Sequence, residues 1–492
     1  MRVFRVWTCF CAFLLIASVS GQAQSDIYHQ TDFPAEEFQA RWQKMYNKLG
    51  NEGLVIVQGA PPVRGFTFPR QTNEFYYVCG IETPGSYFVL DLRQRRAVLF
   101  LPPRNERLER AEGKVLSAAN ADLAKKITGA QEVLSTDALT PDWLSERLGQ
   151  RGRVVYTPFA PAEGNTESRG EIMAANRHIA SDPWDGRLPR ESQFIELLRA
   201  RLSRAEIRDL TPTLDELRSI KSEREIALIR RASELAGLGI LQAIRSTKAG
   251  VFEYQLDAAA RYVFLVNGAR QEGYRSITAA GTPNIWNLHY YRNTKRLEDG
   301  ELVLMDYSPD YRYYVSDIGR MWPVNGKFDK VQRELLQIVL EYRNAIMSRL
   351  RPGVTPDAIM QEARKAMEPV FQRTHFSKPI YEAAARKLVE TGGGVFSHTV
   401  GMAVHDVGSY RRGVLQPGQV FSVDPQMWVP EEQLYIRYED VVVITAAGYE
   451  NFTDFLPAEL DEIEALVGKE GVVQKFPATA GTGSPASKRT SH

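Results

Sequence analysis

This chain has few cysteines and few histidines, and its net charge is close to zero. Only three cysteines occur in 492 residues, and Cys9 and Cys11 lie in an amino-terminal segment that we expect to be removed, which leaves Cys79. One thiol cannot form an intramolecular disulfide, so core packing must stabilise the fold. The net charge of +1 gives no electrostatic reason to expect nucleic acid or an anionic membrane as a partner.

The amino-terminal segment has the pattern of a secretory signal. Met1–Arg5 is basic, Val6–Val19 is apolar, and small residues follow at Gly21 and Ala23. The apolar run is short for a membrane span, which makes a membrane anchor the weaker alternative. We expect a signal peptide at residues 1–23 and a secreted or periplasmic mature protein that has no membrane contact after cleavage.

The rest of the chain, with 43% hydrophobic residues overall, is long enough for two sizeable cores. In the first half β-prone runs alternate with helical stretches, which predicts an α/β domain. Strands are expected at 54–57, 87–90, 97–101 and 154–156, and helices at 38–49, 108–123 and 187–208. Asp209–Pro212 marks the boundary. We expect domains at 24–210 and 211–470 and a disordered tail at 471–492.

Helices are also predicted in the second half. Ser222 and Glu225 form a capping box before a helix with an apolar stripe. The stripe comprises Ile226, Ile229, Ala232, Ala236, Ile240 and Ile244. Further helices are expected at 330–350 and 356–371, before strands that contain unusual carboxylates.

Two aspartates flank a predicted hairpin. β-prone runs lie on either side of a Ser-Pro-Asp turn. If the tip is Tyr311 and Arg312, Asp306 faces Asp317 and both side chains leave the same face. Carboxylates this close repel each other, and a divalent cation between them removes that cost. The structural alternative is that one aspartate is a turn residue and the other pairs with Arg320.

Two of the seven histidines, His398 and His405, follow the glycine run Gly392–Gly394. Glycines let the backbone approach a site closely. A lone histidine is more often a core or surface residue than a ligand, but two beside such a loop favour a site. Downstream, Asp424 and Glu439 interrupt apolar strands, where an unpaired charge is costly. An ion pair between Arg437 and Glu439 is the alternative.

Together these stretches resemble the aminopeptidase P and prolidase family. Asn73–Asp91 and Leu99–Arg104 resemble its non-catalytic domain, and Leu214–Glu225 resembles the start of its catalytic domain. The resemblance covers nearly all of the mature chain. It implies an α/β (α+β) fold, in which an amino-terminal creatinase/aminopeptidase P-like α/β domain precedes a carboxy-terminal pita-bread catalytic domain.

The resemblance also assigns roles to residues. It implies that two divalent metal ions, Mn first with Co or Zn as alternatives, are bound by Asp306, Asp317, His398, Asp424 and Glu439. Its catalytic residues fall on His289, His405, Asp424 and Arg437. In the implied scheme the aspartate moves a proton from water to the leaving nitrogen. The two histidines bind the carbonyl oxygen, and the arginine offsets negative charge.

Two positions depart from the family pattern. Asp424 stands where the family has a glutamate, which withdraws the carboxylate by about 1.5 Å. Gly394 stands where the family has a histidine. The first change affects proton transfer, and the second removes part of the group that grips the substrate.

The expected function is removal of the amino-terminal residue from peptides with proline in second position. A dipeptidase on Xaa-Pro is left open. Aromatic residues that could surround the proline ring are Trp286, Tyr290, Tyr291, Tyr410 and Trp428, although such residues are usually core. Two other classes stay open: a silent, peptide-binding relative, and a metal-free hydrolase resembling creatinase. By analogy with the family we expect a homodimer or a higher homo-oligomer.

Overall fold

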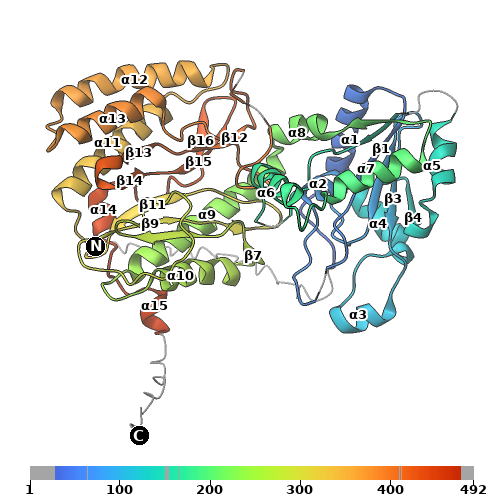
Figure 1. Cartoon of the computed structure of the whole chain (residues 1–492), viewed down its shortest axis with the longest axis horizontal. Coiled ribbons are helices and arrows are strands. Elements are labelled where there is room, and N and C mark those ends of the chain that lie inside the picture. Colours follow the sequence, from blue (N-terminus) through green and yellow to red (C-terminus); the bar gives the residue numbers. More distant parts are fainter. Residues whose placement is uncertain are drawn as a thin grey trace, which may run out of the picture.

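The computed structural model describes residues 28–63, 65–149, 154–164, 166–408, 410–411 and 413–477. They form two domains that lie side by side (Figure 1). The predicted signal peptide lies outside the described residues. No helix among the described residues is both long and apolar enough to cross a membrane.

A six-stranded sheet organises the amino-terminal domain, in the order β4-β3-β2-β1-β5-β6. Its strands are β1 (Leu54–Gln58), β2 (Tyr87–Asp91), β3 (Arg96–Leu101), β4 (Glu132–Ser135), β5 (Val154–Thr157) and β6 (Glu206–Asp209). Successive residues of β1 are apolar because both faces are covered. Val55 and Val57 pack in one cluster, and Leu54 and Ile56 pack in another. The strands predicted in this half are confirmed.

Helices cover both faces of this sheet. The helices of this domain are α1 (Ala35–Leu49), α2 (Asn73–Cys79), α3 (Glu106–Glu112), α4 (Ala121–Thr128), α5 (Pro141–Leu148), α6 (Arg169–Ser181) and α7 (Arg190–Arg201), of which α3 and α6 bury no residue. Phe38 of α1 and Ala124 of α4 belong to the cluster on one face. Leu144 of α5 and Leu198 of α7 belong to the cluster on the other.

Two of the predicted helices differ from the structure. The stretch 108–123 is not one helix, because α3 stops at Gly113, whose φ is 99°, and α4 begins only at Ala121. The charged segment 187–208 is helical only to Arg201. Its end forms β6, which pairs with β5 at the sheet edge, where charged side chains can reach water.

The carboxy-terminal domain holds its sheets between two layers of helices, as the expected pita-bread fold requires (Figure 1). The helices are α8 (Thr211–Ser219), α9 (Glu223–Ser246), α10 (Glu253–Val266), α11 (Lys330–Met347), α12 (Pro356–Arg373), α13 (Pro379–Thr391), α14 (Leu460–Glu464) and α15 (Val472–Lys475). α10 contacts a strand on one side, and α11 and α13 contact strands on the other.

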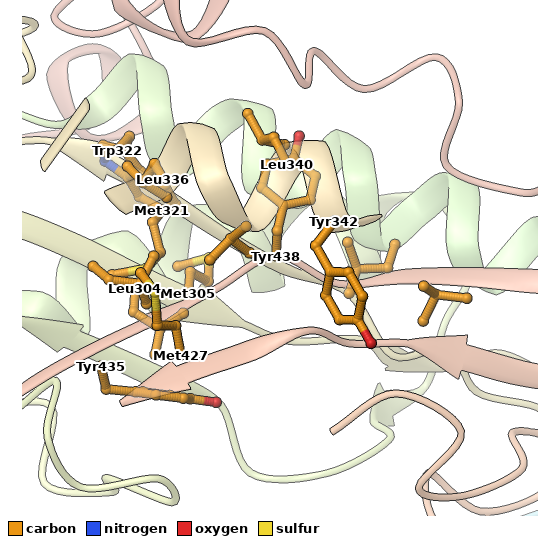
Figure 2. Close-up of a cluster of buried hydrophobic side chains, with 14 of the residues drawn as sticks. Leu304, Met305, Met321, Trp322, Leu336, Leu340, Tyr342, Met427, Tyr435 and Tyr438 are labelled. Atoms are coloured by element: carbon orange, nitrogen blue, oxygen red, sulfur yellow. The ribbon is translucent and has the colours of Figure 1, made fainter. Parts of the chain in front are cut away.

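The strands of this domain form several small sheets. They are β7 (Gln271–Glu272), β8 (Ile277–Ala280), β9 (Leu302–Asp306), β10 (Pro309–Asp310), β11 (Gly319–Pro323), β12 (Val420–Val423), β13 (Gln426–Val429), β14 (Leu434–Arg437), β15 (Asp440–Ile444) and β16 (Tyr449–Asn451). The sheet orders are β11-β9-β8, β12-β15-β16, β13-β14 and β10-β7. Figure 2 shows part of their common core, where Leu336 and Leu340 of α11 pack in one cluster with Met305, Met321 and Met427 of the strands.

The helix predicted from the capping box is confirmed as α9. Ser222 accepts from the Glu225 backbone, and the Glu225 carboxylate accepts from the Ser222 backbone. Every residue of the predicted stripe is buried. The predicted tail differs at its start, because residues 472–475 form α15, where Gln474 donates to the carbonyl oxygen of Ser246 at 3.0 Å.

The hairpin forms, but its predicted register is wrong by two residues. Asp306 pairs with Gly319, and the tip is Arg312 and Tyr313, both with positive φ. The Tyr313 ring stacks on Tyr76 of the amino-terminal domain, with centroids 3.6 Å apart. A shift of two positions keeps each side chain on its predicted face.

Candidate metal centre

The predicted carboxylates converge from separate strands of the carboxy-terminal domain. Asp306 ends β9, and Asp317 lies just before β11. Asp424 follows β12, and Glu439 lies between β14 and β15. Each of the four is at most 3% exposed. Buried carboxylates need a cation or hydrogen-bond donors nearby, so this cluster is a candidate site.

Two groups of potential metal ligands share Asp317. Ligand atoms of Asp306, Asp317 and Glu439 lie within 4.8 Å of one another. Ligand atoms of Asp317, His398 and His405 do so as well. A carboxylate common to both groups is the arrangement that a two-metal centre uses.

The ligand group formed by Asp306, Asp317 and Glu439 suits divalent cations. Burial, and next the charge of Asp306, raises the pKa of Asp317 well above its ordinary value. Burial also raises the pKa of Glu439 far above its ordinary value, with further contributions from Asp317 and Asp424. Glu439 Oε1 is buried without a hydrogen-bond partner. A hard divalent cation would give this oxygen a partner and relieve the repulsion.

His398 is arranged as a neutral ligand. Its Nδ1 lies 3.1 Å from the carbonyl oxygen of Thr399, and its Nε2 lies 3.3 Å from Asp317 Oδ2. Donation from Nδ1 to the carbonyl leaves the Nε2 lone pair directed at the carboxylates. Burial, followed by the nearby His405, lowers the pKa of His398 to about 3. The ring is therefore uncharged at neutral pH, as metal binding requires.

Arg437 lies among the carboxylates. Its Nη1 donates to Asp306 Oδ2 at 2.6 Å, and its Nη2 contacts Glu439. The ion pair with Glu439 that the sequence left open therefore forms, but within the cluster rather than on a sheet surface. The alternative through Arg320 is wrong, because that side chain pairs with Asp440.

Asp424 belongs to neither ligand group among the described residues. Arg437 Nε donates to its Oδ1 and Nη2 to its Oδ2, each at 3.0 Å, and the Gln426 amide also donates to Oδ2. A Cβ on Gly394 would lie 2.6 Å from Gln426 Nε2. The missing side chain at 394 thus makes room for the amide that holds Asp424. Metal binding by Asp424 stays a prediction.

His405 belongs to the second of these groups, and His289 lies beside it. The ring centroids of His405 and His398 are 4.3 Å apart, and those of His405 and His289 are 6.5 Å apart. Burial lowers the pKa of His289. Burial alone would also lower the pKa of His405, but its hydrogen bond with Glu171 and the charge of Asp317 raise it overall.

Sequence reasoning missed three residues at this centre. Tyr274 donates to Asp306 Oδ1 at 2.6 Å and to Asp317 Oδ1 at 3.1 Å. Gln426 holds Asp424, and Glu171 contacts His405 from the other domain. None stands in a motif, and only their position in the folded chain shows their role.

Of the five aromatic residues predicted for a proline pocket, Tyr291 is exposed, and the other four divide into two sets. Tyr290 and Tyr410 are buried, with hydroxyls that donate to Glu253 and to the His398 carbonyl oxygen, which favours a structural role. Trp286 and Trp428 meet edge to face with centroids 5.1 Å apart.

This fold and site define a hydrolase of the metallopeptidase class, and comparison with known proteins agrees. Residues 227–446 match metallopeptidase family M24, and residues 38–156 match the aminopeptidase P, N-terminal domain. The Xaa-Pro aminopeptidase of Escherichia coli strain K12 is 30% identical over 465 residues, which cover 89% of this chain and 98% of that protein. The chain belongs to the aminopeptidase P family.

Solved structures of E. coli aminopeptidase P give the same result. The complex with the inhibitor Pro-Leu is 28% identical, with a TM-score of 0.70, and the similarity covers 89% of this chain and 98% of that one. The zinc-substituted enzyme in complex with product is 27% identical, with a TM-score of 0.69 and the same coverage. The predicted fold class and family are therefore confirmed.

Proposed function

We propose that this protein is a Xaa-Pro aminopeptidase that holds two divalent metal ions and releases the first residue of peptides with proline second. The observation that carries the proposal is the pair of ligand groups that share Asp317. The relatives named Xaa-Pro aminopeptidase supply the substrate class. Mn is the first choice of metal, and the zinc-substituted relative supports zinc as an alternative.

Different residues would bind the metal ions and transfer the proton. Asp306, Asp317, His398 and Glu439 would hold the ions, with Asp424 as the fifth predicted ligand. Divalent ions there would lower the pKa of a bound water and polarise the scissile carbonyl. Asp424 takes a proton from the attacking water at a carboxylate oxygen and gives it to the leaving nitrogen.

The positive and neutral side chains stabilise the charge that develops. His289 and His405, whose ring centroids are 6.5 Å apart, would hydrogen-bond the carbonyl oxygen as it becomes tetrahedral. Arg437 keeps its charge, because neighbouring carboxylates outweigh the effect of burial and raise its pKa further. It therefore offsets the surplus negative charge and holds Asp424 in place.

Proline explains why such an enzyme is needed. The ring makes the scissile amide tertiary and fixes φ, so the peptide lacks the backbone donor that other peptidases use. We propose that Trp286 and Trp428, whose rings are in contact, form part of the wall against which the ring lies.

The experiment compares Xaa-Pro-Xaa and Xaa-Ala-Xaa tripeptides with metal-free and metal-loaded protein. Release of the first residue only from the proline peptide, and only with Mn, Co or Zn present, supports the proposal. Turnover that survives a chelator contradicts it and favours the metal-free hydrolase. A Xaa-Pro dipeptide in the same assay decides between aminopeptidase and dipeptidase. Elemental analysis should give two ions per chain.

Two substitutions of Asp424 test the silent alternative, which the contacts of Asp424 with Arg437 and Gln426 favour. If the shortened carboxylate limits proton transfer, Asp424→Glu raises kcat of an active enzyme, and Asp424→Asn lowers it by about 100-fold or more. Activity that is absent in the unaltered protein and appears only in Asp424→Glu identifies a silent relative.

We also propose export of the protein by the signal at residues 1–23 and assembly into a homodimer or higher oligomer. The amino-terminal residue of the protein recovered outside the cytoplasm tests the first. A molar mass from light scattering tests the second, and a value of one chain contradicts it.

A further inference from the structure

Two hydrogen bonds join the start of α6, in the amino-terminal domain, to His405 of the catalytic centre. The backbone amide of His405 donates to Ser168 Oγ at 3.2 Å. The Nδ1 of the same histidine lies 2.7 Å from Glu171 Oε1. Figure 1 shows α6 at the junction of the two domains. A domain expected to be non-catalytic therefore reaches the site.

Ion pairs fix the position of α6 against the second domain. Arg169, the first residue of α6, donates to both oxygens of Asp215 of α8, at 2.6 and 2.7 Å. The same guanidinium donates to Glu74 of α2 at 3.1 Å. Both bonds to Asp215 come from Nη1, and charge-assisted hydrogen bonds of this length are among the stronger ones in proteins. These ion pairs therefore also hold Glu171, two residues further along α6, in position.

The loop that carries His405 is fixed by a buried arginine. Arg218 of α8 donates to Asp406 at 2.5 Å and pairs with Glu163 of the amino-terminal domain at 2.7 Å. Lys221 donates to the other oxygen of Asp406 at 3.1 Å. Since Arg218 and Asp406 side chains are 1% exposed, this junction is part of the interior. The backbone on both sides of the contact between His405 and Glu171 is therefore constrained.

The contact decides which nitrogen of His405 faces the centre. Glu171 accepts a hydrogen bond from Nδ1, so Nε2 is the nitrogen left for substrate. A carboxylate on one nitrogen of a histidine fixes the proton and the ring orientation at the other. The ring of His398 is oriented in the same way, because its Nδ1 lies 3.1 Å from the Thr399 carbonyl oxygen.

We propose that Glu171 is a positioning residue for His405, so that the amino-terminal domain completes the active site of the carboxy-terminal domain. The inference rests on the proposed function. Its chemistry is a hydrogen bond from Nδ1 to the carboxylate, which fixes the ring with Nε2 toward the centre, where a proton on Nε2 can be donated to the substrate carbonyl oxygen. The half-exposed carboxylate acts through the ring and does not touch substrate.

Kinetics of three variants test the role of Glu171. Glu171→Ala should lower kcat on a Xaa-Pro-Xaa peptide by roughly 10- to 100-fold. This is the range found when a group that hydrogen-bonds the far nitrogen of a metal-ligating histidine is removed. KM should stay unchanged, because the lost interaction orients a group that acts in the transition state. Glu171→Gln keeps an acceptor oxygen and should retain most of kcat. Glu196→Gln, which removes an exposed ion-pairing carboxylate on α7, is the matched control and should leave kcat unchanged.

Nuclear magnetic resonance of the zinc-loaded protein with ¹⁵N-labelled histidine supplies a readout that does not need activity. The chain has seven histidines, so a His405→Gln spectrum assigns the signal of interest. A hydrogen-bonded Nδ1 proton on His405 in the unaltered protein, lost in Glu171→Ala and kept in Glu171→Gln, supports the proposal. Equal spectra and equal kcat in all variants overturn it. If the unaltered protein lacks Xaa-Pro activity but shows the bonded Nδ1 proton, the proposed function fails while the positioning role stands.

Discussion

Arg437 Nη1 donates to Asp306 Oδ2 at 2.6 Å, and the same guanidinium serves three carboxylates. The same side chain binds Asp424 and Glu439. Within the part of the chain that the structure describes, four buried carboxylates, counting Asp317, thus have the guanidinium of Arg437 as their one buried cation. This imbalance explains why the centre suits added divalent cations, and why the arginine is needed before they bind.

Replacing Arg437 with methionine keeps much of the volume but removes the charge. Three carboxylates would lose their shared donor, so the metal-free protein should lose about 3–5 kcal/mol of unfolding free energy. Saturating Mn should reduce that loss. Urea unfolding with and without Mn measures both values. Arg230→Met is the control, because the Arg230–Glu450 pair is exposed and worth at most about 1 kcal/mol. Equal losses in the two variants would contradict this account of the centre.

Metal binding should release protons. Burial and mutual repulsion raise the pKa of Asp317 and Glu439 well above the ordinary range, so the metal-free centre keeps protons to a higher pH than free carboxyl groups do. A cation binds the deprotonated carboxylates, so affinity should rise with pH and binding should acidify an unbuffered solution. Calorimetry in buffers of different ionisation enthalpy measures the protons released. At 100 times Kd the metal should also stabilise the fold by about 2.7 kcal/mol. Binding without proton release would show that the carboxylates are already charged.

The sequence predicted the convergence of the ligands but not their local geometry. Residue types and strand patterns were enough to place Asp306 and Asp317 on one face, because that depends only on alternation along a strand. The register depended on which residues make the turn. Tyr313 adopts positive φ at the tip and stacks on Tyr76, a contact between domains that no local pattern contains.

Other differences have the same cause. The segment 187–208 is helical by composition, yet its last residues pair with β5 because the sheet offers a free edge. Glu171 contacts His405, and Tyr274 contacts Asp306, and both pairs are far apart in the sequence. Their roles depend on how the two domains and the sheets pack, which single-sequence periodicity does not encode.

Gly394 illustrates a departure that only the structure explains. A Cβ there would lie 2.6 Å from the Asp424 carbonyl oxygen and 2.6 Å from Gln426 Nε2. Gly394→Ala should therefore cost about 1–3 kcal/mol, the usual range for overpacking, and lower kcat by displacing Asp424. Gly448→Ala is the control, because a Cβ there meets nothing within 4 Å. Thermal unfolding and peptide assays compare the two. A harmless Gly394→Ala would show that Gln426 does not depend on the space at 394.

Asp440 allows a test of pH dependence next to the centre. It is buried with Arg320 Nη2 2.6 Å from Oδ1 and Arg343 Nε 2.6 Å from Oδ2. Burial alone would raise its pKa, but the two arginines outweigh this and lower the pKa from 3.8 to about 2. Since the folded pKa is depressed, the stabilisation is complete above the unfolded value and is lost as pH falls through the folded one. The amount is about 2 kcal/mol.

Urea unfolding of the metal-free protein and of Asp440→Asn, between pH 6 and pH 2, measures this contribution. Near pH 6 the variant should be less stable by about 3–5 kcal/mol, because two buried arginines lose a charged partner. The difference should shrink by about 2 kcal/mol as the pH falls to 2, where the unaltered carboxylate also becomes protonated. Asp122→Asn, an exposed position on α4, should change stability by less than about 0.5 kcal/mol at each pH. A difference that stays constant with pH would mean that the arginines do not depress the pKa of Asp440.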